Sequence, residues 1–483
     1  MYLGVDIGTS GVKAVLLDDA GAVAGQGSAQ LSVSRPRPLW SEQAADDWWD
    51  AATKAVGQLD PALRRKVRAI GLAGQMHGAT LLGADDRPLR PAILWNDGRS
   101  FAECGELEAA CPDLRTISGN AAMPGFTAPK LAWVRKHEPE VFRQIRRVLL
   151  PKDYVRLKLT GDAASDLSDS AGTLWLDVGK RAWSEPLLAA TGLTPGQMPS
   201  LYEGTEATGR LSREAAALWG VAQVSVAAGG GDNAAGAAGV GVAREGQALL
   251  SLGTSGVIFV ATETFRANPA RGVHAFCHCL PGVWHQMAVH LSAASCVDWV
   301  AALTGASGPG EVFQRAEASG VGAGAELFLP YLSGERTPHN DPHVRGAFLG
   351  LDHDTDAGRL SQAVLEGVAF TLADGLDAIR EAGSQVQRLA VIGGGARSAY
   401  WGRVLAAALD MPLVYLDGGE VGPALGAARL AHAAIEPAAI ADIFTAPPVA
   451  RTVEPEPDLR DRLAAKRPAF RAAYPRIRPE ATS

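Results

Sequence analysis

The same short phrase occurs twice in this chain, and its small residues suit a phosphate-binding turn. Residues 6–12 read Asp-Ile-Gly-Thr-Ser-Gly-Val, and residues 251–257 read Ser-Leu-Gly-Thr-Ser-Gly-Val. Each copy follows a short apolar stretch, so we expect a tight turn at a strand end. There, backbone N–H groups approach a phosphate without obstruction by side chains. One copy in each half predicts a duplicated fold that holds a polyphosphate from both sides.

Only the first copy has a carboxylate ahead of its turn, and this asymmetry indicates a metal. Asp6 is suited to serve a magnesium ion, whereas Ser251 at the matching position is less suited. Lys13 would neutralise terminal phosphate oxygens, and hydroxyl groups in the turn would donate hydrogen bonds. The pattern predicts a magnesium–ATP site that includes Asp6, Gly8, Thr9, Ser10 and Lys13.

A second carboxylate, Asp232, follows three glycines and precedes an alanine-rich stretch that is typical of a helix. A plain N-cap is one interpretation of this residue. A helix N-terminus also lowers the pKa of a carboxyl, which would keep Asp232 ionised and able to accept a proton from a hydroxyl. The glycines leave room for a ligand, and Asn233 offers both a donor and an acceptor for a polyol.

Three further glycine-rich segments follow predicted strands, where ligands bind in open α/β sheets. Met76 and His77 lie between Gly74 and Gly78; a lone histidine is more often structural, but the flanking glycines favour a position in a cleft. A similar strand end carries Trp95, Asn96, Asp97 and Arg99. After the strand 389–392, Gly393–Gly395 suits a nucleotide that lies flat over the backbone, with Gly394 and Gly395 as contacts.

The elements around the first turn exclude two common nucleotide-binding motifs. Residues 3–7, 11–17 and 22–27 are predicted to be three short strands in a meander, whereas a dinucleotide fingerprint needs a helix after its glycines. The spacing of a Walker loop is also absent around Lys13. A second meander begins near Ala248, so we predict a sugar-binding domain over 1–243 and a nucleotide-binding domain over 244–483. We expect the tail after about residue 436 to pack back on the first domain.

Composition limits the class of protein and its partners. The 483 residues suffice for two large domains, and the net charge of −7 without a basic run argues against nucleic acid and membranes as partners. No secretory signal is visible, and five scattered cysteines favour a reducing, cytoplasmic location. His274, Cys277, His278 and Cys279 are close in sequence, but alternation along predicted strands 273–280 and 284–289 favours a strand pair over a zinc site.

At this point the chain resembles the FGGY carbohydrate kinase family, within the actin-like ATPase superfamily, over nearly its whole length. The two Gly-Thr-Ser-Gly turns are similar to the family's phosphate motifs. Residues 125–137 fit its first signature and residues 346–366 resemble its second, with a departure at Arg359. Segments 74–78, 95–99 and 332–338 are similar to the branch that acts on the pentulose D-xylulose. Members that act on glycerol have Arg-Glu where this chain has Met76-His77.

The resemblance implies two ribonuclease-H-like domains around a central cleft that holds ATP and a sugar. It implies that Asp232 is the general base, that Asp6 holds Mg²⁺, and that Met76, His77, Asp232 and Asn233 contact the sugar. It further implies a nucleotide site that includes Gly253, Thr254, Gly394 and Gly395. The implied reaction converts ATP and D-xylulose to ADP and D-xylulose 5-phosphate.

Two alternatives stay open from the sequence. The first is a sister kinase for ribulose, another pentulose or a glycerol-like polyol, which shares the fold and both aspartates. The second is a non-catalytic sugar or ATP sensor, against which the presence of both Asp6 and Asp232 argues. The oligomeric state is also open, with a homodimer as one option.

Overall fold

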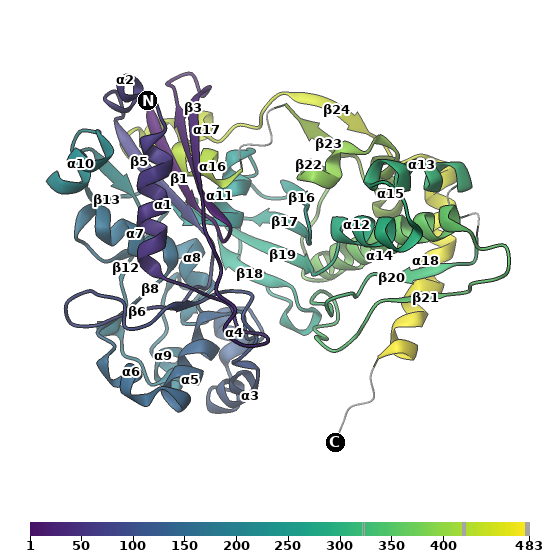
Figure 1. Cartoon of the computed structure of the whole chain (residues 1–483), viewed down its shortest axis with the longest axis horizontal. Helices are drawn as coiled ribbons and strands as arrows, with labels where there is room; N and C mark the ends of the chain where they lie inside the picture. The colour runs from purple at the N-terminus through teal and green to yellow at the C-terminus, as the bar shows by residue number, and fades with distance from the viewer. Residues whose placement is uncertain (321, 323, 418–421, 479–483) are drawn as a thin grey trace.

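The protein consists of two α/β halves, each built around a seven-stranded sheet (Figure 1). The computed structural model describes residues 1–320, 322, 324–417 and 422–478. The predicted α/β class with two sheet-containing halves is confirmed. None of the helices in the described part of the chain has the length and apolar character needed to cross a membrane.

In the first sheet, the predicted meander lies beside the parallel strand β5, which precedes Met76 and His77. Its order is β13-β14-β5-β1-β2-β3, and the short strand β15 also pairs with β5. The strands are β1 (Tyr2–Ile7), β2 (Gly11–Leu17), β3 (Val23–Gln30), β5 (Ala69–Gly74), β13 (Ala207–Arg210), β14 (Ser225–Ala227) and β15 (Gly230–Gly231). Strands β1 and β5 are almost entirely buried because helices cover both faces of this sheet. The packing helices include α1 (Ala45–Gly57), α7 (Pro151–Thr160) and α11 (Asp232–Gly239).

The second sheet repeats the meander and has the order β18-β19-β17-β16-β22-β23-β24. Its strands are β16 (Ala248–Leu252), β17 (Gly256–Thr262), β18 (His274–Cys277), β19 (Trp284–His290), β22 (Leu389–Ile392), β23 (Leu413–Leu416) and β24 (Val449–Val453). Strand β18 ends at Cys277 and is therefore shorter than the predicted 273–280. Among the described residues, no three His, Cys, Asp or Glu side chains form a group suited to a metal.

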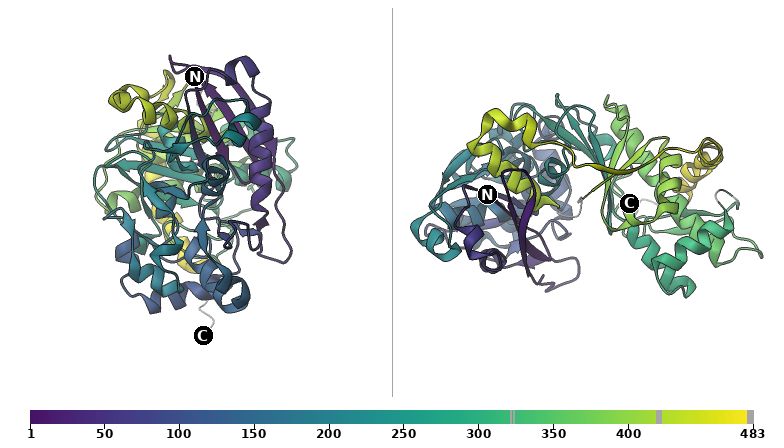
Figure 2. Two further views of the ribbon diagram at one scale, coloured as in Figure 1. Left: turned by 90° about the vertical axis from the view of Figure 1, so that its left-hand side faces the viewer. Right: turned by 90° about the horizontal axis from the view of Figure 1, so that it is seen from above.

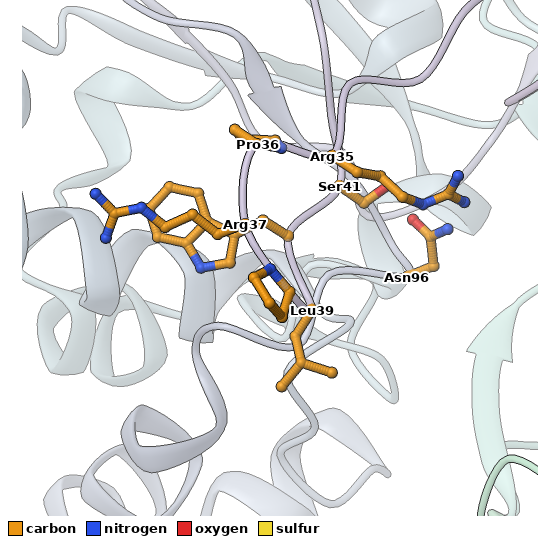
Figure 3. A pocket seen from close by; sticks show the side chains of 8 residues that line it. Arg35, Pro36, Arg37, Leu39, Ser41 and Asn96 are labelled. Carbon is orange, nitrogen blue, oxygen red and sulfur yellow. The ribbon is translucent and has the colours of Figure 1, made fainter.

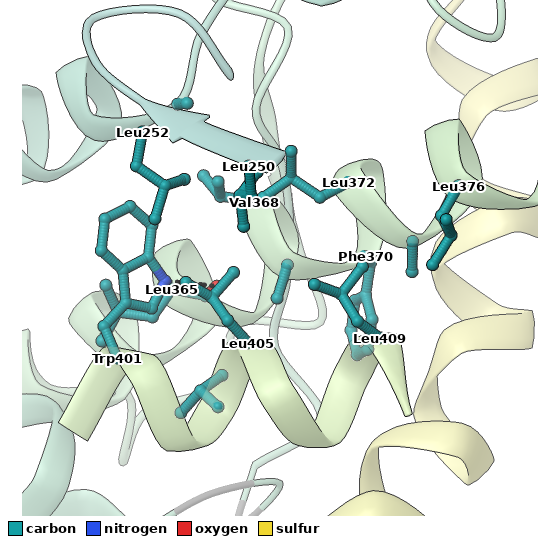
Figure 4. Packing of buried hydrophobic residues seen from close by; sticks show 14 of the residues in the cluster. Leu250, Leu252, Leu365, Val368, Phe370, Leu372, Leu376, Trp401, Leu405 and Leu409 are labelled. Atoms are coloured by element: carbon teal, nitrogen blue, oxygen red, sulfur yellow. Dashed lines mark hydrogen bonds between the residues drawn. The ribbon is translucent and has the colours of Figure 1, made fainter. Parts of the chain in front are cut away.

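Helices on one face of the second sheet form its core (Figure 4). Leu250 and Leu252 of β16 pack against Leu365 and Leu372, and Trp401 closes one end of the cluster. The helices of this half are α12 (Ala294–Thr304), α13 (Pro309–Ser319), α14 (Ala357–Glu381), α15 (Ala399–Leu409) and α18 (Pro457–Ile477). Strands β20 (Leu327–Leu329) and β21 (Ala347–Leu349) form a separate hairpin.

One helix late in the chain belongs spatially to the first half. Helix α16 (Pro423–Ile435) packs on β1 and β5, and Figure 2 shows it with α17 (Ile440–Ile443) beside the N-terminal strands. Glycines permit this close approach: a Cβ on Gly4 would overlap the carbonyl oxygen of Ala424, and one on Gly71 would overlap that of Ala427. Strand β24 and helix α18 then return to the second half. The boundary at residue 243 stays a prediction.

Short elements on either side of β5 in the chain complete the first half, and the region that follows β5 contacts the second half. The helices are α2 (Pro61–Arg64), α3 (Phe101–Ala110), α4 (Leu114–Ser118), α5 (Thr127–His137), α6 (Pro139–Gln144), α8 (Leu167–Ala171), α9 (Glu185–Thr191) and α10 (Arg213–Trp219). The short strands are β4 (Glu42–Gln43), β6 (Thr80–Leu82), β7 (Ala92–Ile93), β8 (Arg147–Leu149), β9 (Ala164–Asp166), β10 (Leu176–Asp177), β11 (Ala182–Trp183) and β12 (Ser200–Tyr202). Phe276 of β18 packs in one cluster with Met76 and Phe126, so this edge of the second sheet lies against the inserted region.

Candidate active site

The topology of the first sheet brings the two predicted carboxylates together. Asp6 lies opposite Ala73 of β5, and Gly230 of β15 lies opposite the same residue on the other side. Asp232 follows two residues later as the first residue of α11. The charge of Asp232 acts directly on Asp6, so two strand ends that are far apart in sequence form one acidic site.

Asp6 is half-buried, and its Oδ1 atom is buried without a hydrogen-bond partner. Burial, and to a smaller extent repulsion by Asp232, together raise the pKa of Asp6 to about 7. Lys13, opposite Asp6 on β2, lowers this pKa through its positive charge. An orphaned carboxylate oxygen beside a second carboxylate is chemically suited to a hard divalent cation, which needs few protein ligands when phosphate oxygens and water complete its shell.

Asp232 is held by its neighbour in the chain. The backbone N–H and the side-chain Nδ2 of Asn233 both donate to Asp232 Oδ1, at 2.7 and 2.9 Å. Burial raises the pKa of Asp232 to about 6, against the opposing effect of these hydrogen bonds. The predicted lowering of this pKa is therefore wrong, because the loss of solvent outweighs the hydrogen bonds from Asn233 at the start of the helix.

The first phosphate turn is fixed by side chains around it. The N–H of Gly8 donates to the carbonyl of Gly11 at 3.0 Å, which closes the turn. Thr9 Oγ1 donates to Gln75 Oε1 at 2.9 Å and accepts from the indole of Trp95 at 3.0 Å. The hydroxyl proton of Thr9 is thus already engaged, whereas Ser10 is exposed. This arrangement leaves the backbone of the turn, Ser10 and Lys13 for a ligand.

The second turn and the triple glycine lie at neighbouring strand ends of the second sheet. Strands β16 and β22 are parallel partners, and a Cβ on Gly393 would lie 2.6 Å from the carbonyl oxygen of Leu252. The carbonyl of Thr254 accepts a bond from Ser295 Oγ at 2.8 Å, and the carbonyl of Gly253 accepts one from the N–H of Ala294 at 2.9 Å. These contacts tie the turn to the start of α12.

The two glycines predicted to bind the nucleotide differ in their surroundings. A Cβ on Gly394 would meet no atom within 4 Å, so this position is open. A Cβ on Gly395 would lie 2.8 Å from the Trp401 ring and 3.0 Å from Leu252 Cβ. The loop is therefore packed on one side and free on the other, as a backbone platform for a flat ligand requires.

His77 has a defined tautomer, which decides the hydrogen bond it offers. Its Nδ1 lies 2.6 Å from the carbonyl of Gly172, and a carbonyl only accepts, so Nδ1 carries the proton. Burial and then the charge of Lys130 lower the pKa of His77 to about 3, so the ring is neutral. Its Nε2 consequently has a free lone pair that can accept from a hydroxyl. The backbone φ of +70° is held by bonds from Thr127 and Lys130 to the His77 carbonyl.

The Met76 side chain lies near both His77 and the residue before Asp232. The Met76 side chain is buried, and a Cβ on Gly231 would lie 3.1 Å from its sulfur. A Cβ on Gly172 would lie 2.9 Å from Met76 Cε and 2.7 Å from His77 Nδ1. The structure therefore brings Met76, His77 and the residue before Asp232 into one region. The nearby guanidinium of Arg336, from the second half, also lowers the pKa of His77.

Comparisons with known proteins agree with this geometry. The model of the N-terminal domain of the FGGY family of carbohydrate kinases matches residues 1–239, and the model of the C-terminal domain matches residues 248–435. The chain belongs to the FGGY family of carbohydrate kinases. It is 53% identical to the xylulose kinase of Escherichia coli (strain K12), over 99% of both chains. It is 37% identical to the xylulose kinase of Bacillus subtilis (strain 168), over 89% of this chain and 87% of that protein.

A solved structure of a xyloylose kinase from Brucella ovis is 51% identical to this FGGY kinase. It superimposes with a TM-score of 0.96 over 99% of both chains. The two-domain fold of the family, predicted from the sequence as ribonuclease-H-like halves of an actin-like ATPase, is thereby confirmed. The departure at Arg359 has a structural account: its guanidinium makes ion pairs with Glu326 at 2.6 Å and Asp352 at 3.2 Å.

The sequence of this FGGY kinase did not show which residues of the segment Trp95–Arg99 contact a ligand and which only stabilise the loop. Asp97 and Arg99 are paired with each other at 2.7 Å and are almost fully buried, so their charges are satisfied internally. Asp97 also accepts from the N–H of Ser41 at 2.6 Å. Asn96 instead lines a hollow of about 480 Å³ with Arg35 and other residues of the loop before β4 (Figure 3). The Asp-x-Arg spacing in the sequence could have indicated this structural role, because it allows an ion pair within the loop.

Proposed function

We propose that this FGGY kinase transfers the terminal phosphoryl group of ATP to D-xylulose and releases ADP and D-xylulose 5-phosphate. The observation that carries the proposal is the 53% identity to a xylulose kinase over 99% of both chains. The site supports it, because a half-buried carboxylate pair, a neutral histidine and two phosphate-type turns are the parts that phosphoryl transfer to a hydroxyl needs.

Asp232 is the general base in this proposal. Its carboxylate accepts the proton of the sugar hydroxyl as the oxygen attacks the terminal phosphorus of ATP, and the bond from that phosphorus to the ADP oxygen breaks. Both hydrogen bonds from Asn233 go to Oδ1, and Oδ2 makes no bond to any described residue, so it is free to take the proton. The proton afterwards leaves to solvent, which balances the reaction.

Asp6 is the residue that would hold Mg²⁺, directly or through water. The metal would supply charge neutralisation at the phosphate oxygens. Lys13 contributes a further positive charge on the same side of the sheet. Gly8, Thr9 and Ser10 form the first phosphate cradle, Gly253 and Thr254 form the second, and Gly394 and Gly395 support the nucleotide. Catalysis is then mostly positioning and electrostatic stabilisation.

His77, with Met76 shaping the pocket wall and Asn233 beside the base, accounts for sugar recognition. The tautomer of His77 makes Nε2 an acceptor, so it selects a ligand with a hydroxyl donor at that point. A buried acceptor left without its donor costs more than the bond itself contributes. The arrangement therefore suits a polyhydroxylated substrate such as an open-chain pentulose.

We expect His77→Ala to raise the KM for D-xylulose roughly 2- to 12-fold, since one lost hydrogen bond typically costs about 0.5–1.5 kcal/mol. The KM for ATP should stay within about twofold, because His77 is hydrogen-bonded to Gly172, Thr127 and Lys130, none of which is assigned to the nucleotide. Steady-state kinetics with each substrate varied in turn measure both constants. A larger effect on ATP than on sugar would contradict the assignment.

A control for backbone strain is needed because His77 has a positive φ. Asparagine tolerates this conformation better than alanine but does not reach as far as the imidazole Nε2. His77→Asn should therefore raise the sugar KM as His77→Ala does. If asparagine restored wild-type constants, strain rather than a lost contact would explain the alanine variant.

The proposed substrate is tested by a coupled assay of ADP release with D-xylulose, D-ribulose, hexuloses, glycerol and gluconate. We expect the highest kcat/KM with D-xylulose. A higher kcat/KM with another sugar would change the proposed substrate, but the assignment as a sugar kinase would stand. The absence of sugar-dependent ADP release across the panel would overturn the proposed function.

A further inference from the structure

A buried charged cluster lies near the proposed base, and none of the roles assigned above uses it. The ammonium of Lys152 lies 2.5 Å from Asp153, 2.8 Å from Asp166 and 3.4 Å from Asp169. All four side chains are at most 1% exposed. A buried cluster of this kind is costly to desolvate, so its retention calls for an explanation beyond stability.

Hydrogen bonds connect this cluster to the residue before Asp232. Asp166 caps α8 by accepting from the N–H of Ser168 at 2.7 Å, and it also accepts from the Ser168 hydroxyl. Ser168 Oγ in turn accepts from the N–H of Gly231 at 3.0 Å. The path therefore runs from Lys152 through Asp166 and Ser168 to the peptide that immediately precedes the base.

The backbone just before Asp232 is closely packed against Leu72, Cys279 and Met76, but it has no side chains of its own to fix its orientation. Residues 229–231 are all glycine, and Gly229 adopts a φ of +90°. Glycine has the widest conformational freedom and no side chain to anchor it. Strand β15 is two residues long, and its pairing with β5 orients one side of it. The Ser168 hydroxyl holds the peptide N–H of Gly231.

We propose that Ser168, held in place by Asp166 and Lys152, is a positioning residue that fixes the orientation of Asp232. The inference rests on the proposed function, because it concerns the base of that reaction. Ser168 acts on the peptide before Asp232 and not on substrate. Its loss should therefore misplace the proton acceptor while leaving the nucleotide site intact.

The test compares two serines of the same short helix. Ser168 and Ser170 are both fully buried in α8, but the Ser170 hydroxyl donates to Ser165 Oγ at 2.9 Å and does not reach β15. We expect Ser168→Ala to lower kcat about 10- to 100-fold, the range that a displacement of about 1 Å at a reacting group costs. The KM for ATP should stay within about twofold, and Ser170→Ala should keep wild-type kcat.

Two further measurements separate positioning from folding. Thermal unfolding should show a similar decrease in Tm for both alanine variants. Ser168→Thr, which keeps the hydroxyl, should recover most of the lost kcat. Replacement of Lys152 is a poorer test, since it leaves several buried carboxylates unpaired. A kcat for Ser168→Ala equal to that of Ser170→Ala would overturn the inference.

Hydrogen exchange distinguishes failure of this inference from failure of the proposed function. Exchange in the segment 229–233 should be faster in Ser168→Ala than in Ser170→Ala, whatever substrate the enzyme uses. If the wild-type protein phosphorylated no sugar, the proposed function would fall, and the exchange result would still show whether Ser168 holds the strand end. Equal exchange in the two variants would overturn the role of Ser168.

Discussion

Asp232→Asn should lower kcat about 10²- to 10⁴-fold, the usual cost of losing a general base. The substitution keeps the size of the side chain and the contact with Asn233 but removes the proton acceptor. Nucleotide binding and Tm should stay close to wild type. Single-turnover kinetics and thermal unfolding measure the two properties separately, and a variant with more than a third of wild-type turnover would overturn the assignment.

The pH dependence of the wild-type enzyme gives an independent check on Asp232. Burial raises the pKa of this carboxyl from 3.8 to about 6, and the ionised form is the one that accepts a proton. In the wild type, kcat/KM for the sugar should therefore fall as the pH drops through about 6. The residual activity of Asp232→Asn should lack this acid limb. An identical limb in the variant would assign it to another group.

Asp6→Asn should lower kcat/KM by about 10²-fold or more at a fixed magnesium concentration, as expected when a key electrostatic group at the transferred phosphate is removed. The amide is a weaker ligand for a divalent cation than the carboxylate, so half-maximal activity should require more magnesium. A magnesium titration at saturating ATP and sugar measures this shift. An unchanged magnesium dependence would place the metal elsewhere.

The same substitution should stabilise the ligand-free protein. The pKa of Asp6 is raised from 3.8 to about 7 in the folded state, so folding favours the protonated form. Stability from this group is present below pH 4 and is lost as the pH rises through 7. Asp6→Asn should therefore raise Tm more at pH 8 than at pH 5, in the absence of ligands. A lower Tm for the variant at pH 8 would show that ionised Asp6 is stabilising.

The sequence predicted the chemical residues better than their mutual placement. Asp6 and Asp232 were recognisable because each adjoins glycines at an element boundary. The pairing of both β1 and β15 with β5, which brings them together, joins Asp6 to Ala73 and Gly230 to the same residue, 67 (73 minus 6) and 157 (230 minus 73) residues apart, so no local pattern encodes it. The net rise in the pKa of Asp232, in which burial outweighs the hydrogen bonds from Asn233, likewise depends on the packed surroundings.

The residues that hold the functional side chains in place were harder to predict than the residues assigned to ligand contact. The segment from Ser165 to Ser170 is rich in Ser and Asp, a composition typical of an exposed loop, yet Asp166, Ser168 and Asp169 are fully buried. Lys152 makes this burial possible by neutralising part of their charge, and it lies on a different helix. Sequence alone gives no sign of that pairing. The same holds for Gln75, whose bond to Thr9 fixes the phosphate turn.

The position of helix α16 has a consequence for how the chain is made on the ribosome. Strands β1 and β5 are complete once the first 74 residues have been synthesised, but the helix that packs closely on them ends at Ile435. Almost all of the polypeptide must therefore leave the ribosome before this face of the first sheet can be covered. The N-terminal half of the enzyme cannot mature by itself during translation. Newly made chains keep an apolar surface open to chaperones and to aggregation until synthesis is nearly finished.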